Sequence, residues 1–280
     1  MKHEEGFFAG VRAQQIYFQN WLPEGEVKAV LLVVHGLAEH SGRYMNLVNH
    51  FVPKGYAVYA VDHIGHGRSE GARVFVERFT DFTDTIATFR EMIRKRQKDK
   101  PVFLVGHSMG GLIGALYLVA HQGELAGAVL SGPAVKIPDT VPAITIFLGK
   151  ILSVLAPKSR LIAPPDAGAV SRDPEVVRAY ENDPLVYRGK MTPRLGAELL
   201  KAMQRIGAEA SRIGLPILIL QGSADRLVDP AGARMLYDRV TSPDKRIIVY
   251  EGLYHEVFNE PEHDRVLSDV ETWLKKLGSE

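Results

Sequence analysis

One stretch of twenty residues, from Pro101 to Ala120, constrains the fold more than any other part of the chain. It begins with an apolar run, Val102 to Val105, typical of a strand buried on both faces of a parallel sheet. The pentapeptide Gly106-His107-Ser108-Met109-Gly110 follows directly, and apolar residues at helical spacing come after it. Such a turn lifts the serine hydroxyl above the sheet edge, because its glycines permit a tight bend. The stretch therefore predicts an α/β fold organised around a nucleophilic serine.

The rest of the chain alternates between strand and helix patterns. A hairpin is predicted at 7–21, buried strands at 27–34 and 56–61, and further strands at 125–130, 216–221 and 246–250. Helices are predicted at 46–54, 79–93, 231–240 and 261–277. Repeated strand–helix units predict a mostly parallel, doubly wound sheet. Prolines interrupt the pattern between the strands at 125–130 and 216–221, where we expect several short helices. We therefore expect a core made of 1–133 and 206–280, with a helical cap (lid) insertion at 134–205.

Composition excludes several classes of function. The formal charge of +1 over 280 residues gives no electrostatic reason to expect a nucleic acid partner. The absence of cysteine excludes disulfides, thiolate metal sites and a cysteine nucleophile. The first residues lack the apolar segment of a signal peptide, so we expect a cytoplasmic protein. The basic run 94–100 fits a solvated helix end better than a phosphate-binding patch, and the sequence does not indicate an oligomeric state.

A nucleophilic serine needs a base within hydrogen-bond reach, and the base needs an acid that orients it. In this type of fold the acid and then the histidine follow the serine along the chain. Asp225 comes just after the predicted strand 216–221, and His255 lies in the loop after the last predicted strand. We therefore predict that Ser108, Asp225 and His255 form a catalytic triad.

Each triad residue has a rival. Ser69 lies in a second G-x-S-x-G, at 67–71, but no helix follows it directly, so we interpret it as a polar loop residue. Asp229 precedes Pro230 and a helix, which is typical of a helix start. His263 falls inside the terminal helix and is expected to be solvated.

A tetrahedral intermediate needs donors for its oxyanion. The backbone N–H of Met109, at the start of a helix, and that of Leu37, after the strand at 27–34, are the predicted donors. The other histidines of the strand-end loops could suggest a metal site, but their scattered spacing favours structural roles for His35, His40, His63, His66 and His107. We predict no metal and no cofactor.

Long blocks of sequence resemble a known family. The blocks are HGLAEHSGRY (35–44), DHIGHGRSEG (62–71), GHSMGG (106–111), GSADRLVDP (222–230) and EGLYHE (251–256). The chain is similar in these blocks to the monoacylglycerol lipase and lysophospholipase family of serine α/β-hydrolases. The resemblance implies the α/β-hydrolase fold and places the triad at the same three residues.

The resemblance also implies substrate contacts. The residues that match Glu39 and Arg43 lie near the glycerol end of the family's pocket, although a buried ion pair is an equally good interpretation of these two. Two positions depart from the mammalian enzymes, which have a histidine where this chain has Phe258 and a cysteine where it has Val228.

The insertion contains a nearly all-apolar segment, 141–155, interrupted by Lys150 and too short to span a bilayer. We predict a lid helix that lines an acyl tunnel through Ile146 and Leu152 and that can contact a membrane or lipid aggregate peripherally. The alternative is a buried packing helix.

The expected function is hydrolysis of small acyl esters, monoacylglycerols first, through an acyl-enzyme on Ser108. Lysophospholipids or simple short- and medium-chain esters are alternative substrates for the same triad. A non-catalytic lipid-binding protein is a further alternative, but such a protein typically lacks a triad residue, and here all three are present.

Overall fold

The computed structural model describes residues 1–138 and 142–278. Their strands form one eight-stranded sheet in the order β1-β2-β4-β3-β5-β6-β7-β8. The strands are β1 (Lys2–Ala9), β2 (Gln15–Leu22), β3 (Ala29–Val34), β4 (Tyr56–Val61), β5 (Val102–His107), β6 (Gly127–Ser131), β7 (Ile217–Gly222) and β8 (Lys245–Tyr250). The strands from β4 through β8 in this order pair in parallel, whereas β1 and β2 are antiparallel to their neighbours. The predicted α/β-hydrolase fold is confirmed.

The helices follow the strands in the predicted alternation. The α-helices are α1 (Met45–Phe51), α2 (Thr80–Arg96), α3 (Met109–His121), α4 (Ala143–Leu155), α5 (Pro174–Asn182), α6 (Pro193–Glu209), α7 (Ala231–Arg239) and α8 (His263–Leu277). Short 3₁₀ helices occur at Val11–Ala13, Ser41–Tyr44, Val52–Lys54, Gln122–Glu124, Ala167–Ala169 and Ala210–Arg212. Most predicted boundaries hold within two residues. The hairpin is longer than predicted, because β1 begins at Lys2 and not near Phe7.

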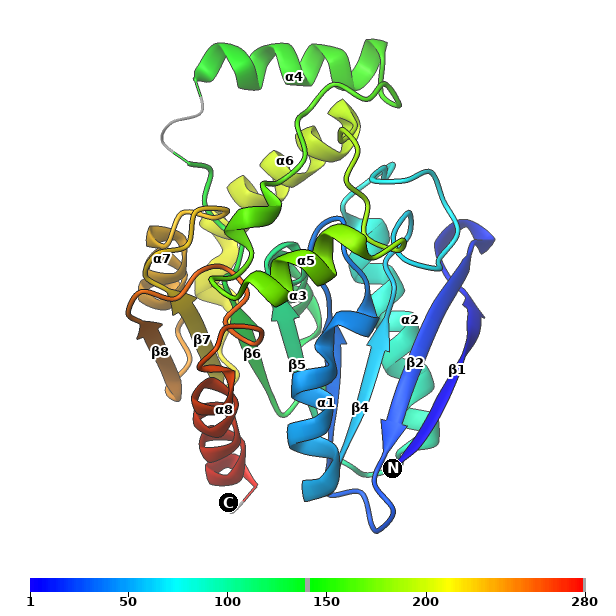
Figure 1. Cartoon of the computed structure of the whole chain (residues 1–280), viewed down its shortest axis with the longest axis vertical. Helices are drawn as coiled ribbons and strands as arrows, with labels where there is room; N and C mark the ends of the chain where they lie inside the picture. The colour runs from blue at the N-terminus through cyan, green and yellow to red at the C-terminus, as the bar shows by residue number, and fades with distance from the viewer. Residues whose placement is uncertain (139–141, 279–280) are drawn as a thin grey trace.

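Two apolar layers enclose the sheet. All six residues of β3 are buried, and alternate ones point to opposite faces. Leu31 and Val33 belong to the apolar layer that includes α1 and α8, whereas Val30, Leu32 and Val34 belong to the opposite layer, which includes α2, α3 and α7. Figure 1 shows α1 and α8 on the face of the sheet nearer the viewer. The continuous apolar runs in the sequence therefore mark central strands with both faces covered.

Between β6 and β7 the chain forms helices α4, α5 and α6, as predicted, but α6 has seventeen residues and is not short. In Figure 1, α4 lies at the end of the molecule remote from α1 and α8, beyond α6. The far half of α6 joins the apolar layer around α3 through Ala202 and Ile206, so the predicted boundary at residue 205 falls inside a helix. The division into core and cap stays a prediction.

Helix α4 exposes its apolar side chains. Ile144, Val154 and Leu155 are 61%, 71% and 77% exposed, and among the described side chains of α4 only Ser153 is buried. The alternative of a buried packing helix is therefore wrong. Val141, at the start of the predicted apolar segment, lies outside the described residues. No helix in the described ranges is long and apolar enough to cross a membrane.

Candidate active site

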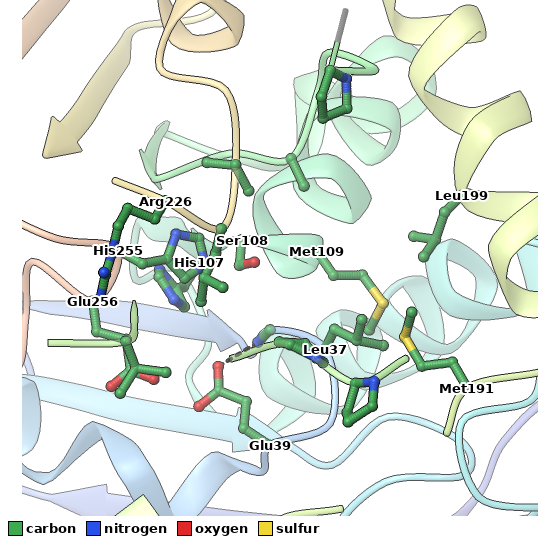
Figure 2. A pocket seen from close by; sticks show the side chains of 18 of the residues that line it. Leu37, Glu39, His107, Ser108, Met109, Met191, Leu199, Arg226, His255 and Glu256 are labelled. Carbon is green, nitrogen blue, oxygen red and sulfur yellow. Dashed lines mark hydrogen bonds between the residues drawn. The ribbon is translucent and has the colours of Figure 1, made fainter. Parts of the chain in front are cut away.

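Ser108 sits at the junction of β5 and α3, with no residue between strand and helix other than itself. Its backbone has φ +55° and ψ −119°, a conformation that residues with a side chain rarely adopt. The Ser108 N–H donates to the carbonyl of Ser131, 2.9 Å away, which ties the turn to the end of β6. The sequence therefore folds into the predicted elbow, and Figure 2 shows the Ser108 side chain facing a cavity.

The glycines of the pentapeptide are required by close backbone contacts. A Cβ on Gly110 would lie 1.9 Å from the carbonyl oxygen of Val34, and one on Gly106 would lie 2.5 Å from that of Gly110. Helix α3 can thus start against the end of β3 only if these positions lack side chains.

The second G-x-S-x-G serves a different purpose. Ser69 is buried, accepts a hydrogen bond from the N–H of Tyr17 at 2.8 Å and donates one to the carbonyl of Asp62 at 2.7 Å. Both bonds tie a loop to neighbouring backbone. The interpretation of Ser69 as a structural loop residue is confirmed.

His255 and Asp225 form a buried pair beside Ser108. The Nδ1 of His255 lies 2.7 Å from Oδ2 of Asp225, and the two side chains are 4% and 0% exposed. The N–H groups of Leu227 and Val228 donate to the other carboxylate oxygen, at 2.8 Å and 3.1 Å. Burial alone raises the pKa of the Asp225 carboxyl, but the hydrogen bond and charge of His255, with these N–H groups, hold that pKa below its ordinary value. Asp225 is therefore an anion that orients His255.

The rivals of these two residues lie elsewhere. Asp229 accepts the N–H of Ala231 at the start of α7 and pairs with Lys136 at 2.6 Å, as expected for a residue at a helix start. His263 is the first residue of α8, half-buried, with its Nδ1 2.8 Å from the carbonyl of Glu260. It is therefore less solvated than predicted.

The cavity next to Ser108 has a volume of about 300 Å³. Ser108, His255, Leu37 and Met109 all line it, which brings together four of the predicted site residues. Most of the rest of its wall is apolar and is contributed by Val170, Met191, Leu199, Met203, Leu227 and Val228, with several alanines and prolines. The backbone donor roles of Leu37 and Met109 stay predictions.

The predicted acyl contacts lie outside this wall. Neither Ile146 nor Leu152 is among the described residues that line the cavity, and Leu152 is 37% exposed. Their contact with substrate stays a prediction.

Glu39 and Arg43 form part of a buried ionic network. The Nη1 of Arg43 lies 3.2 Å from Glu39 and 2.5 Å from Glu256, and its Nη2 lies 2.8 Å from the second oxygen of Glu256. The hydroxyl of Tyr44 donates to Glu39 at 2.8 Å. The ion-pair interpretation is confirmed, and Glu39 also lines the cavity.

The pKa values of the two carboxyls in the network are shifted in opposite directions. Burial raises the pKa of Glu39, helped by the charge of Glu256 and opposed by that of Arg43. Burial also works against ionisation of Glu256, but the charge and hydrogen bonds of Arg43 lower its pKa to about 2. Sequence reasoning missed Glu256, although its place next to His255 in a matched block was a usable signal.

Four other histidines of the site region, His35, His63, His66 and His107, are buried, and burial lowers the pKa of each. Burial lowers the pKa of His63 and His107 to about 3 and that of His66 to about 4, and it brings the pKa of His35 well below the ordinary value. His40, also buried, contacts Asp183 at 2.8 Å. Within residues 1–138 and 142–278 no group of three or more His, Cys, Asp or Glu side chains is arranged to hold a metal ion.

Comparison with known proteins gives consistent matches. The family model described as serine aminopeptidase, S33, matches residues 25–262. Monoacylglycerol lipase of Mycolicibacterium smegmatis is 42% identical over 96% of each chain, and human monoglyceride lipase is 36% identical over 94% of this chain and 88% of its own. The crystal structure of a monoacylglycerol lipase from Paleococcus ferrophilus superposes with a TM-score of 0.82 at 32% identity, covering 100% of this chain and 99% of that one. The chain therefore belongs to the serine aminopeptidase S33 family of α/β-hydrolases, and over nearly its whole length it is similar to monoacylglycerol lipases.

Proposed function

We propose that this protein is a carboxylic ester hydrolase that cleaves monoacylglycerols to glycerol and a free fatty acid. The observation that carries the proposal is that Ser108, at a strained elbow, lines one cavity with His255, whose Nδ1 is hydrogen-bonded to the buried Asp225. The full-length similarity to monoacylglycerol lipases supports the choice of substrate.

In the proposed reaction Ser108 Oγ attacks the ester carbonyl, while Nε2 of His255 takes the hydroxyl proton. Asp225, held anionic by His255 and two backbone N–H groups, stabilises the imidazolium that forms. The proton then goes to the leaving glycerol oxygen, which leaves an acyl group on Ser108. Water repeats the cycle on this acyl-enzyme and releases the fatty acid.

The surroundings of His255 suit this proton transfer. The ring of His107 lies 4.6 Å from that of His255, and its burial lowers its pKa to about 3. At neutral pH His107 therefore adds no positive charge next to the imidazole that must become protonated. The backbone N–H groups of Leu37 and Met109 serve as the proposed oxyanion donors.

The insertion completes the proposed site as a cap. Its segments contribute Val170, Met191, Leu199 and Met203 to the apolar wall, which suits an acyl chain. The apolar side chains that α4 exposes are the proposed contact with a membrane surface or lipid aggregate, at which long-chain substrate is delivered.

The test compares wild type with Ser108→Ala on a panel of monoacylglycerols, lysophospholipids and p-nitrophenyl esters of several chain lengths. We expect the highest kcat/KM for a monoacylglycerol and a loss of about 10⁴-fold or more in the variant, with an unchanged circular dichroism spectrum. A higher kcat/KM for a lysophospholipid or a short ester would identify that compound, and not a monoacylglycerol, as the preferred substrate. Lipid binding without any turnover would instead support the non-catalytic alternative.

A further inference from the structure

Leu37, the proposed oxyanion donor, lies in the loop after β3. The Glu39 side chain accepts a hydrogen bond from one backbone N–H of this loop. The N–H of Gly36 donates to Oε1 of Glu39 at 2.6 Å. A side chain on Gly36 would bring its Cβ within 2.8 Å of that same oxygen and within 3.1 Å of the Ser108 Cβ. Figure 2 shows the Glu39 carboxylate pointing toward the backbone near Leu37. The carboxylate thus fixes the backbone that faces Ser108.

The next peptide group is held from the other side by His35. The N–H of His63 donates to Nε2 of His35 at 2.9 Å, so the proton of this buried, neutral ring is on Nδ1. That Nδ1–H donates to the carbonyl of Gly36 at 2.7 Å. A trans peptide is planar, and its C=O and N–H point in opposite directions. The bond to the Gly36 carbonyl therefore sets the direction of the Leu37 N–H.

Glu39 is itself held rigidly. Oε1 also accepts the hydroxyl of Tyr44 at 2.8 Å, and Oε2 lies 3.2 Å from Nη1 of Arg43, which in turn pairs with Glu256 beside the proposed base. Both carboxylate oxygens thus have protein partners, and the side chain is 5% exposed. A group in this position is arranged to orient backbone, not to bind a substrate hydroxyl.

We propose that Glu39 is a positioning residue for the oxyanion hole. It holds the Gly36 N–H while His35 holds the Gly36 carbonyl, and only when both peptide groups are held does the N–H of Leu37 point at the oxyanion. The inference rests on the proposed function, because it assumes turnover on Ser108. It differs from the expectation that Glu39 contacts the glycerol group. A contact with glycerol matters only for glycerol esters, whereas an aligned oxyanion donor matters for every ester.

The experiment measures kcat and KM for a monoacylglycerol and for p-nitrophenyl butyrate, which has no glycerol. Glu39→Ala removes the acceptor, Glu39→Asp keeps the charge on a side chain one methylene too short, and Glu39→Gln keeps an acceptor oxygen of the right length. We expect Glu39→Ala to lower kcat about 10- to 100-fold on both substrates with KM within about twofold, Glu39→Asp to lose about 10-fold, and Glu39→Gln to lose least. If the alanine variant does not fold, the aspartate variant carries the test.

Glu198→Ala is the matched control, because Glu198 is also buried and accepts a backbone N–H, that of Phe79 at 3.0 Å, but lies outside the cavity wall. Its kcat is expected to stay within about twofold of wild type. A raised KM for the monoacylglycerol alone, or unchanged kcat for butyrate in the alanine and aspartate variants, overturns the inference. A wild-type protein that hydrolyses neither ester, or a Ser108→Ala variant that hydrolyses both, overturns the proposed function instead.

Discussion

Helices α3 and α4 are alike in length and apolar composition but lie in opposite environments. Both have thirteen residues and are mostly apolar. Every residue of α3 from Met109 to Val119 is buried, whereas most described side chains of α4 are exposed. Helix α3 follows a central strand and lies against the sheet, whereas α4 lies in the segment between β6 and β7, at the end of the molecule beyond α6 (Figure 1). The position of an apolar helix in the fold, and not its composition alone, therefore decides whether its side chains are buried in the core or exposed on the surface.

The two regions also differ in how closely their backbones are held. Around the start of α3, a Cβ added at Gly106 or Gly110 would clash with neighbouring backbone, and the Ser108 N–H is hydrogen-bonded to the Ser131 carbonyl. In α4, a Cβ added at Gly149 would meet nothing within 4 Å. We therefore expect substitutions around Ser108 to have large effects and those on α4 to have small effects that depend on the substrate.

The largest effect is expected at the acid of the site. Asp225→Asn should lower kcat for p-nitrophenyl butyrate by about 10⁴-fold, because the neutral amide no longer fixes the tautomer of His255. Asp229→Asn, the matched control, should keep kcat within about threefold, since Asp229 contacts Ala231 and Lys136. A larger loss in the second variant would move the acid to Asp229.

The next effect contrasts two glycines directly. Gly110→Ala should lower the free energy of unfolding by about 3 kcal/mol, because its Cβ would lie 1.9 Å from the Val34 carbonyl oxygen. Gly149→Ala should raise it by about 0.5–1 kcal/mol, because alanine favours a helix and the space is open. Urea denaturation measures both. Equal changes in the two variants would remove the contrast between the regions.

The smallest effect is expected on the exposed face of α4. Phe147→Ser combined with Val154→Ser should lower activity on long-chain monoacylglycerol in vesicles by about two- to fivefold, because less apolar area reaches the lipid. Activity on soluble butyrate and the Tm should stay unchanged, since both side chains are already more than half exposed. An equal loss on both substrates would show that α4 supports the fold and not the delivery of lipid.

Much of the core was predictable because its signals are local. The strand, the pentapeptide and the helix around Ser108 are contiguous, so short-range pattern sufficed. Asp225 and His255 were found by their place after strands, because parallel strands bring their carboxyl ends to one edge. The structure places these two in hydrogen-bond contact and brings His255 and Ser108 to one cavity.

The rest depends on contacts between distant segments. Arg43 and Glu256 are 213 residues apart in sequence, and no periodicity links an arginine in a short 3₁₀ helix to a glutamate in a distant loop. For α4 the sequence left two interpretations, an exposed lid helix and a buried packing helix, because hydrophobic spacing reports a helix and not its neighbours; the structure excludes the buried one. Ile146 and Leu152 were chosen as members of this nearly all-apolar segment, and the cavity wall as described does not include them.

The backbone angles of Ser108 carry a thermodynamic consequence. A residue held in so sparsely populated a conformation costs on the order of 1–3 kcal/mol, a sizeable share of the roughly 5–15 kcal/mol by which a typical domain is stable. Glycine adopts such angles with far less strain, but it has no hydroxyl. The protein therefore keeps a permanent loss of stability at position 108, where the side chain carries the hydroxyl that we propose as the nucleophile. Selection for thermal resistance alone would favour a glycine there and so act against the serine.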